Sequence, residues 1–189
     1  MLQAGLHNLR QASVRITEVS PRDGLQHESE FVPTLRKISL INALSRTGVT
    51  EIEAGSFVSP AAIPQLADSD EVLRAIDRIP GVTYSALVPN ERGLERARAA
   101  GVDKIAVFTA ASNSFTRHNI KATVQESLVR FRPIVAAAKR DGMAVRAYLS
   151  TVVFCPYEGR IAPTQVRDVM ERLLDLAVDD ISLGETVGK

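Results

Sequence analysis

Short runs of apolar and β-branched residues alternate with longer segments of helical periodicity along the whole chain. The short runs are brief and mostly apolar, as strands buried on both faces must be. They predict strands at Ser13–Val19, Thr50–Ala54, Thr83–Leu87, Lys104–Thr109, Ala144–Ser150 and Asp180–Leu183. Apolar positions recurring every three or four residues predict helices at Thr34–Thr47, Asp70–Ile79, Glu91–Ala100, Val124–Asp141 and Pro163–Ala177. This alternation predicts a parallel sheet with crossover helices and no interdomain linker.

Local sequence signals support these boundaries without deciding the architecture. Asn90 is a suitable N-cap, Thr123 with Glu126 forms a capping box, and Pro163 suits a first helical turn. The spacing of the strands fits the repeat of a (β/α) barrel, but a doubly wound open sheet has the same local signature. Periodicity therefore predicts an α/β fold and leaves both arrangements open.

The composition narrows the class of partner. The chain is 45% hydrophobic and 24% charged, which describes one globular domain with ample material for a core. Its 23 basic and 22 acidic residues leave a formal charge of +1, so no electrostatic footprint for nucleic acid or an anionic membrane stands out. Apolar runs such as Ile134–Ala138 are far shorter than the roughly 20 residues of a membrane span. We expect a small-molecule partner, no nucleic acid and no membrane.

The cysteine count and the first residues of the chain bear on location. Cys155 is the single cysteine, so no internal disulfide can form, and no apolar signal sequence leads the chain. The first 13 residues contain no acidic residue and include Arg10, a weak likeness to a transit peptide. A reducing cytoplasm fits these features best, and we expect a cytoplasmic protein.

Polar residues gather just after the predicted strands, the edge at which parallel α/β folds bind ligands. The residues at or just after the strand ends are Arg22, Asp23 and Gln26 for the first strand, Glu53 and Ser56 for the second, Asn113 and Asn119 for the fourth, Tyr148 and Ser150 for the fifth, and Glu185 and Thr186 for the sixth. Glu53 interrupts a buried strand, where a carboxylate is costly unless it is paired or used, and Arg22 is the obvious partner. A guanidinium fixed by one carboxylate beside a second, Asp23, could stabilise an oxyanion and hold a hard divalent cation. An ordinary turn and a structural salt bridge remain alternatives.

Other kinds of site fit the sequence poorly. The chain has no Walker-type phosphate loop, no cysteine pair for zinc and no G-x-S-x-G nucleophile elbow. His27 and His118 fall in loops on the presumed ligand-binding face, but no two histidines form a paired ligand motif. No adjacent base or helix start favours a reactive thiolate at Cys155, so we interpret it as a packed or loop thiol.

Four motifs give the sequence a specific resemblance. They are EVSPRDGLQ at Glu18–Gln26, EAGSFVSP at Glu53–Pro60, CPYEG at Cys155–Gly159 and SLGETVG at Ser182–Gly188. Together they resemble the 3-hydroxy-3-methylglutaryl-CoA lyases, metal-dependent (β/α)8 enzymes of the pyruvate carboxyltransferase-like superfamily. The first motif alone would also admit isopropylmalate or citramalate synthases. The resemblance implies an α/β TIM barrel over residues 14–189, with residues 1–13 as an N-terminal extension.

The resemblance also implies roles for individual residues. Asp23 matches a ligand to Mg²⁺ or Mn²⁺, Arg22 matches the arginine that contacts substrate and stabilises the enolate, and Glu53 matches the glutamate beside that arginine. Gln26, Tyr148 and Thr186 fall where the family lines its acyl pocket. The implied reaction is retro-Claisen cleavage of 3-hydroxy-3-methylglutaryl-CoA, an acyl-CoA substrate, to acetyl-CoA and acetoacetate. Such a reaction needs a metal to acidify the hydroxyl, a base and a cation for the enolate.

The sequence also departs from the family pattern. The H-x-H metal motif, the G-x-G-G-C-P loop with its catalytic cysteine and the late asparagine ligand of strands seven and eight are absent, and Glu185 replaces an aspartate. Six predicted strands in 189 residues compare with about 250 residues for a full barrel, so we expect an incomplete barrel lacking strands seven and eight. With Asp23 as the only recognisable ligand, we expect the chain alone to hold metal poorly and to be inactive.

Alternatives to an active lyase follow from these departures. Exposed barrel edges would suit a homo-oligomer, or a non-catalytic acyl-CoA binder completed by a partner. A related metal-dependent lyase, synthase or aldolase is a third alternative.

Overall fold

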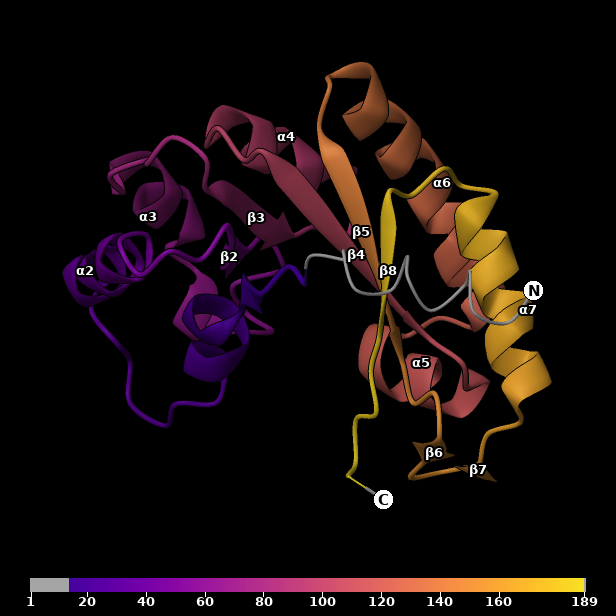
Figure 1. Ribbon diagram of the computed structural model, residues 1–189. Helices are drawn as coiled ribbons and strands as arrows, with labels where there is room; N and C mark the ends of the chain where they lie inside the picture. Colours follow the sequence, from indigo (N-terminus) through magenta and orange to yellow (C-terminus); the bar gives the residue numbers. More distant parts are fainter. Residues whose placement is uncertain (1–13, 189) are drawn as a thin grey trace, which may run out of the picture.

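A curved sheet of six parallel strands forms the centre of the computed structural model, which describes residues 14–188. The strands are β1 (Thr17–Glu18), β2 (Glu51–Ser56), β3 (Thr83–Leu87), β4 (Lys104–Ala110), β5 (Ala144–Ser150) and β8 (Asp180–Leu183). Their order is β1-β2-β3-β4-β5-β8, and every neighbouring pair is parallel. Figure 1 shows the sheet curling with helices outside it. The fold is an incomplete TIM barrel.

Helices follow the strands in the alternating pattern of a barrel. The crossover helices are α2 (Thr34–Leu44), α3 (Ser69–Ala75), α4 (Glu91–Ala99), α6 (Val124–Arg140) and α7 (Pro163–Leu174). An additional helix, α5 (Asn113–Ile120), follows β4, and a hairpin of β6 (Phe154–Cys155) and β7 (Gly159–Arg160) follows β5. Both additions lie at the carboxyl ends of the strands (Figure 1). They extend the edge at which barrels bind ligands.

The core lies between the sheet and the crossover helices. Ile52, Ile105 and Leu149 on the strands and Ile134 on α6 are fully buried. Burying an aliphatic side chain of this size contributes roughly 1.5–3 kcal/mol relative to leaving it exposed. This layer fixes the strands, and the strands position the polar side chains on the inner face of the sheet.

Most elements agree with the sequence pattern, and the differences have local causes. The strand predicted from Ser13 covers only Thr17–Glu18, and Ser13 lies outside the described residues. The helix predicted over Asp70–Ile79 ends at Ala75, because Ile76 is extended with ψ of 148°. Pro80 also disfavours helical backbone at the preceding residue. Helix α5 and the β6–β7 hairpin were not predicted. The expected extension at residues 1–13 lies outside the described part of the chain.

A close backbone approach shapes β2 beside the candidate site. The β2–β3 register shifts between Glu53 and Gly55. A Cβ atom added at Gly55 would lie 2.8 Å from the Ser69 hydroxyl at the start of α3. Glycine therefore lets α3 pack against the end of β2. In the described part of the chain, no helix is long and apolar enough to cross a membrane.

Candidate active site

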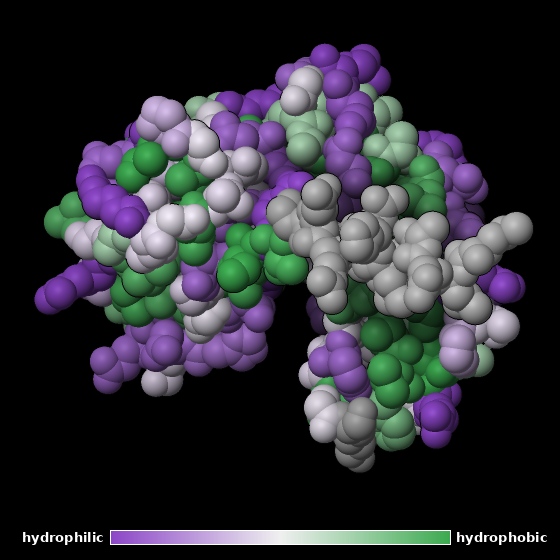
Figure 2. Space-filling view, viewed as in Figure 1, coloured by the Kyte–Doolittle hydropathy of each residue, from purple (hydrophilic) through white to green (hydrophobic). Residues whose placement is uncertain are grey.

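A cavity of about 830 Å³ opens at the carboxyl ends of the strands. Figure 2 shows the molecule hollowed between the parts that carry α2 and α3 on the left and α5 with the hairpin on the right. Of the residues that the resemblance assigns to the site, all but Glu53 line this cavity, and Glu53 binds two of the lining residues, Arg22 and Tyr148. The lining members of that set are Arg22, Asp23, Gln26, Tyr148 and Thr186. The cavity is the candidate active site.

A tight turn after β1 delivers Arg22 to this cavity. Ser20–Gly24 forms one turn of π-helix with Pro21 in its first turn. The N–H groups of Arg22 and Asp23 both donate to the carbonyl of Val19, at 3.1 and 2.7 Å. The turn therefore places two neighbouring charged side chains at the end of the first strand.

Arg22 is held from two sides by carboxylates. Its Nε donates to Glu53 Oε1 and its Nη1 donates to Asp23 Oδ1 at 2.6 Å. Glu53 is fully buried, and its other oxygen accepts the Tyr148 hydroxyl at 2.7 Å. The guanidinium carbon also lies 5.6 Å from the centre of the Tyr148 ring, within cation–π range. The predicted Arg22–Glu53 pairing is confirmed, with Tyr148 as an additional partner.

These contacts shift two pKa values. Burial works against the charged form of Arg22, but the nearby carboxylates of Glu53 and Asp23 outweigh it, so the pKa of Arg22 is raised. Burial and the negative charge of Glu53 raise the pKa of the Tyr148 phenol, and the Arg22 and Arg146 cations oppose this only in part. Tyr148 is therefore a neutral hydrogen-bond donor at physiological pH, and Arg22 is a fixed cation.

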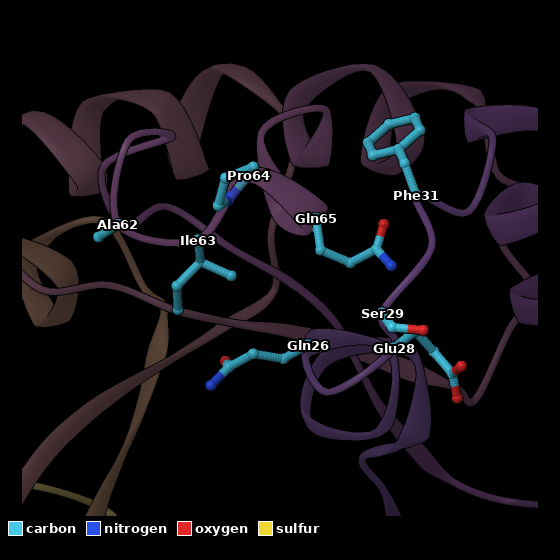
Figure 3. Close-up of a pocket in the computed structure, with 8 residues that line it drawn as sticks. All are labelled: Gln26, Glu28, Ser29, Phe31, Ala62, Ile63, Pro64 and Gln65. Carbon is cyan, nitrogen blue, oxygen red and sulfur yellow. The ribbon is translucent and has the colours of Figure 1, made fainter.

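Gln26 links the main cavity to a second, smaller one. The smaller cavity has a volume of about 410 Å³ and is lined by Gln26, Phe31 and Gln65, among others. Figure 3 shows Gln26 and Ile63 reaching into it from opposite segments of the chain. At the other side of the main cavity, Thr186 Oγ1 accepts the N–H of Thr151 at 3.2 Å. Gln26 follows β1 and Thr186 follows β8, the two edge strands of the sheet, so these two residues line opposite ends of the site.

The apolar wall of the main cavity was not predicted. It includes Leu87, Phe108, Phe115 and Ile120. Phe108 pairs in register with Tyr148 on the neighbouring strand, so its ring lies beside the polar cluster. The period-two alternation of strand β4 contains the signal for Phe108, because Lys104 and Phe108 share a face. Phe115 and Ile120 come from the unpredicted helix α5.

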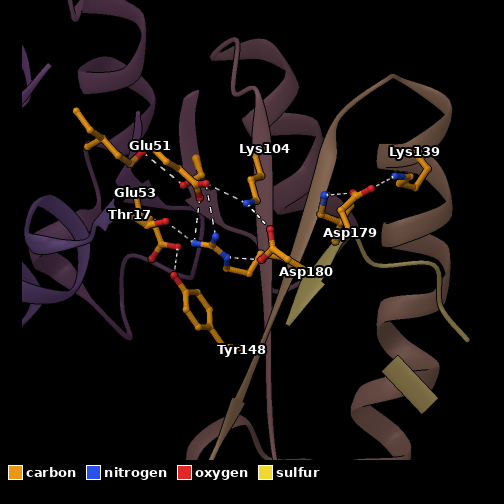
Figure 4. Close-up of polar contacts among 12 residues, drawn as sticks. Thr17, Glu51, Glu53, Lys104, Lys139, Tyr148, Asp179 and Asp180 are labelled. Carbon is orange, nitrogen blue, oxygen red and sulfur yellow. Dashed lines mark hydrogen bonds and ion pairs between the residues drawn. The ribbon is translucent and has the colours of Figure 1, made fainter. Parts of the chain in front are cut away.

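A buried charge cluster lies one layer further from the cavity, toward the amino ends of the strands, and is drawn above Tyr148 in Figure 4. Lys104 Nζ lies 3.1 Å from Glu51 Oε2 and 2.6 Å from Asp180 Oδ2. Arg146 pairs with Asp180 through Nε, lies 3.0 Å from Glu51 Oε1 through Nη1, and donates from Nη2 to Glu51 Oε2 at 3.5 Å. It also donates to Thr17 Oγ1 at 3.0 Å, which reaches across to β1. Two cations thus balance two anions inside the sheet.

The described residues offer little for a metal ion. Within residues 14–188, no group of three or more His, Cys, Asp or Glu side chains is arranged to hold one. The side chain of Asp23 is 49% exposed, but one of its oxygens is engaged by Arg22. A single carboxylate competes poorly with water for a divalent cation. The described residues alone therefore do not fit a metal site.

The fold and the site together define a class. A parallel α/β barrel sheet with an anchored arginine at its carboxyl edge belongs with the α/β-barrel proteins that bind small ligands at that edge. Comparison with known proteins gives the family: the HMGL-like family matches residues 13–189, and this chain belongs to it.

Individual relatives agree with this assignment. The chain is 50% identical over 175 residues to the mitochondrial hydroxymethylglutaryl-CoA lyase of Bos taurus, covering 93% of this chain and 54% of the relative. The crystal structure of the HMG-CoA lyase from Brucella melitensis matches with a TM-score of 0.91 and 52% identity, over 93% of this chain and 62% of that one. An Acinetobacter baumannii HMG-CoA lyase in complex with coenzyme A and 3-methylmalate matches with a TM-score of 0.88 and 39% identity, over 93% and 57%. The chain spans about half the length of the bovine relative.

Proposed function

We propose that this chain supplies the substrate-anchoring part of a 3-hydroxy-3-methylglutaryl-CoA lyase, a carbon–carbon lyase that forms acetyl-CoA and acetoacetate. The observation that carries the proposal is the Arg22 guanidinium, fixed by Glu53 and Asp23 at the wall of an 830 Å³ cavity. Membership of the HMGL-like family supports it. Because the chain spans about half of the bovine relative, the proposal assigns it a part of the site.

The chemistry demands a cation where the enolate forms. In retro-Claisen cleavage the tertiary hydroxyl loses its proton, the bond between C2 and C3 breaks, and its electrons move onto the thioester as an enolate that then takes up a proton. Arg22 has N–H groups beyond the two that bind Glu53 and Asp23. We assign these groups to the enolate oxygen, because donors already held in place stabilise developing charge most effectively. Glu53 acts by orienting Arg22. No described residue is assigned as the base.

The remaining predicted residues are assigned to substrate binding. Gln26, Tyr148 and Thr186 line the cavity and offer an amide, a phenol and a hydroxyl. The phenol of Tyr148 already donates to Glu53, so it contacts substrate through its ring edge or as an acceptor. We propose a coenzyme A thioester as the ligand, with support from the solved relative that holds coenzyme A.

Mg²⁺ or Mn²⁺ would supply acidity at the tertiary hydroxyl, and Asp23 would be one of its ligands. Since residues 14–188 hold no group of three metal-ligating side chains, we assign no step of the reaction to the metal. The same observation favours a second candidate function for the chain by itself, namely binding of an acyl-CoA without turnover. A cytoplasmic location remains a prediction, because the bovine relative carries a mitochondrial name.

Calorimetric titration of the chain with 3-hydroxy-3-methylglutaryl-CoA, together with an acetoacetate assay in Mg²⁺, tests both candidates. We expect binding without acetoacetate release. Arg22→Lys should weaken binding at least tenfold, because lysine cannot reproduce the forked contacts of a guanidinium. Arg167→Lys on α7, whose side chain is 66% exposed, is the matched control. Equal binding by the two variants would contradict the role of Arg22, and acetoacetate release would contradict the second candidate.

A further inference from the structure

The CPYEG motif at Cys155–Gly159 has no role in the lyase proposal, yet its side chains make specific contacts. The motif forms most of the β6–β7 hairpin, in which Gly159 has a φ of +78° that favours glycine. Figure 1 shows the hairpin beyond the end of β5, next to α5. The contacts of the motif are with that helix.

Glu158 caps the first turn of α5. Its Oε1 accepts the N–H of Ser114 at 2.7 Å. Ser112 is the N-cap residue: its hydroxyl accepts the N–H of Phe115 at 3.0 Å and contacts the Cys155 thiol, also at 3.0 Å. Partial burial works against the charged form of Glu158, but its hydrogen bonds with Ser114 and Ser112 and the Arg117 cation outweigh it, so the pKa of Glu158 is lowered. A carboxylate at a helix start also interacts favourably with the helix dipole.

Tyr157 holds the other side of the same helix. Its ring stacks on His118, with ring centres 4.0 Å apart and planes inclined by 11°. It also contacts Phe115 with ring centres 6.5 Å apart, and Phe115 contacts Phe108 at 6.4 Å. A row of four rings therefore runs from the exposed hairpin to the inner face of β4.

The helix that the hairpin holds is a wall of the main cavity. Phe115, Asn119 and Ile120 of α5 line it. Phe115 is one residue beyond the amide that Glu158 caps, and three residues before the ring on which Tyr157 stacks. The position of Phe115, and with it the width of the apolar end of the cavity beside Tyr148, therefore depends on two side chains that do not line the cavity.

We propose that the β6–β7 hairpin is a clasp that fixes α5 as the apolar wall of the cavity. Tyr157 and Glu158 are positioning residues, and Phe115 is a specificity-determining residue that contacts the acyl part of a coenzyme A thioester. The identity of the ligand rests on the proposed function, whereas the clasp itself rests on the contacts between the hairpin and α5.

Hydrogen exchange followed by mass spectrometry on the chain measures the clasp without any ligand. Glu158→Ala should speed exchange of the α5 amides about fivefold, the usual consequence of losing a helix cap. Glu158→Gln, which keeps an acceptor, should lie between that variant and the original. Tyr157→Ala should also speed exchange of the α5 amides. Tyr157→Phe keeps the stacked ring, so its α5 amides should exchange at the rate of the original chain. Asp179→Asn is the matched control, because Asp179 also accepts a backbone N–H at 2.7 Å, from Val145, but lies at the amino ends of the strands.

Binding of 3-hydroxy-3-methylglutaryl-CoA and of free coenzyme A to the same variants separates positioning from stability. We expect Glu158→Ala and Tyr157→Ala to weaken thioester binding severalfold more than binding of free coenzyme A, and Asp179→Asn to leave the ratio unchanged. Unchanged α5 exchange in both alanine variants would overturn the clasp. Faster exchange with an unchanged ratio would overturn the specificity role. If the original chain binds neither compound, the proposed function fails, while the exchange data still decide the clasp.

Discussion

Replacing Glu53 with glutamine tests whether the site depends on a buried charge pair. The substitution keeps the size of the side chain and removes the negative charge that faces Arg22. Glu53 is fully buried, and the Arg22 side chain is only 12% exposed. A structural contact of ordinary strength would tolerate the change, whereas a buried cation that loses its main partner would not.

The expected cost follows from the contacts that remain. Leaving one partner of a buried ion pair uncompensated costs about 3–5 kcal/mol. Arg22 keeps Asp23 at 2.6 Å and some contact with water, and glutamine can still accept one hydrogen bond from Tyr148 or Arg22. We therefore expect a loss of about 2–3 kcal/mol in the free energy of unfolding, below the range for a fully isolated pair.

Urea unfolding at pH 7 measures this loss as a lower midpoint with an unchanged slope. Glu171→Gln is the control, because Glu171 on α7 forms an exposed ion pair with Arg167 at 3.6 Å. Exposed pairs contribute about 0–1 kcal/mol, so the control should unfold close to the original midpoint. If both variants unfold at the same midpoint, the Arg22–Glu53 pair does not stabilise the site and the assignment of Glu53 as the residue that orients Arg22 is wrong.

Four further outcomes are expected. The raised pKa of Tyr148 keeps its phenol protonated at pH 10, where an unperturbed tyrosine is half ionised, so Tyr148→Phe should leave the 295 nm titration below pH 10 unchanged. Burial works against the charged form of Asp179, but Lys139 and the Val145 N–H outweigh it, so the pKa of Asp179 is lowered. The contribution of Asp179 to the free energy of unfolding is therefore present at neutral pH and lost as pH falls below about 4. Asp179→Asn should lower the free energy of unfolding at pH 7 and reduce its fall between neutral and acid pH. Lys104→Met should cost about 3 kcal/mol of unfolding free energy, against less than about 1 kcal/mol for Lys139→Met, since the first cation is buried and the second is 38% exposed. Sedimentation should detect self-association through the edge strands β1 and β8, and a purely monomeric chain would refute it.

The sequence predicted the alternation of the fold well because each buried strand is a compact apolar run. Five of the six strands begin within one residue of the predicted position. The exception, β1, begins only at Thr17, because Thr17 pairs with Glu51, the first residue of the neighbouring strand β2. It ends where the π-helical turn begins at Ser20. Such a turn depends on backbone hydrogen bonds to Val19, which leave no periodic signal in the sequence.

The polar part of the site was easier to predict than its apolar part. A carboxylate inside a buried strand is unusual, so Glu53 pointed to a partner, and the structure places Arg22 there. Phe108 carries only a weak signal, its place on the same face of β4 as Lys104, because an aromatic residue in a strand is ordinary core material. Phe115 lies in helix α5, which was not predicted. Helix α5 was missed because its sequence, NSFTRHNI, is short and mostly polar. It is held by the cap at Ser112 and by contacts with the distant hairpin, which local periodicity does not encode.

The two polar layers inside the sheet explain how the site can be ordered before any ligand arrives. Glu51 and Glu53 are two residues apart on β2, and Arg146 and Tyr148 are two residues apart on β5, so each pair points to the same face. The layer nearer the amino ends of the strands joins β2 and β5 through the contact of Arg146 with Glu51. The layer nearer the cavity joins them through the hydrogen bond of Tyr148 with Glu53. Any shift of one strand against the other would break both contacts. The orientation of the guanidinium after β1 is therefore fixed by the register of the neighbouring strand β2 against β5, which lies across the sheet. Donors fixed in this way need little reorganisation when charge develops on a bound thioester.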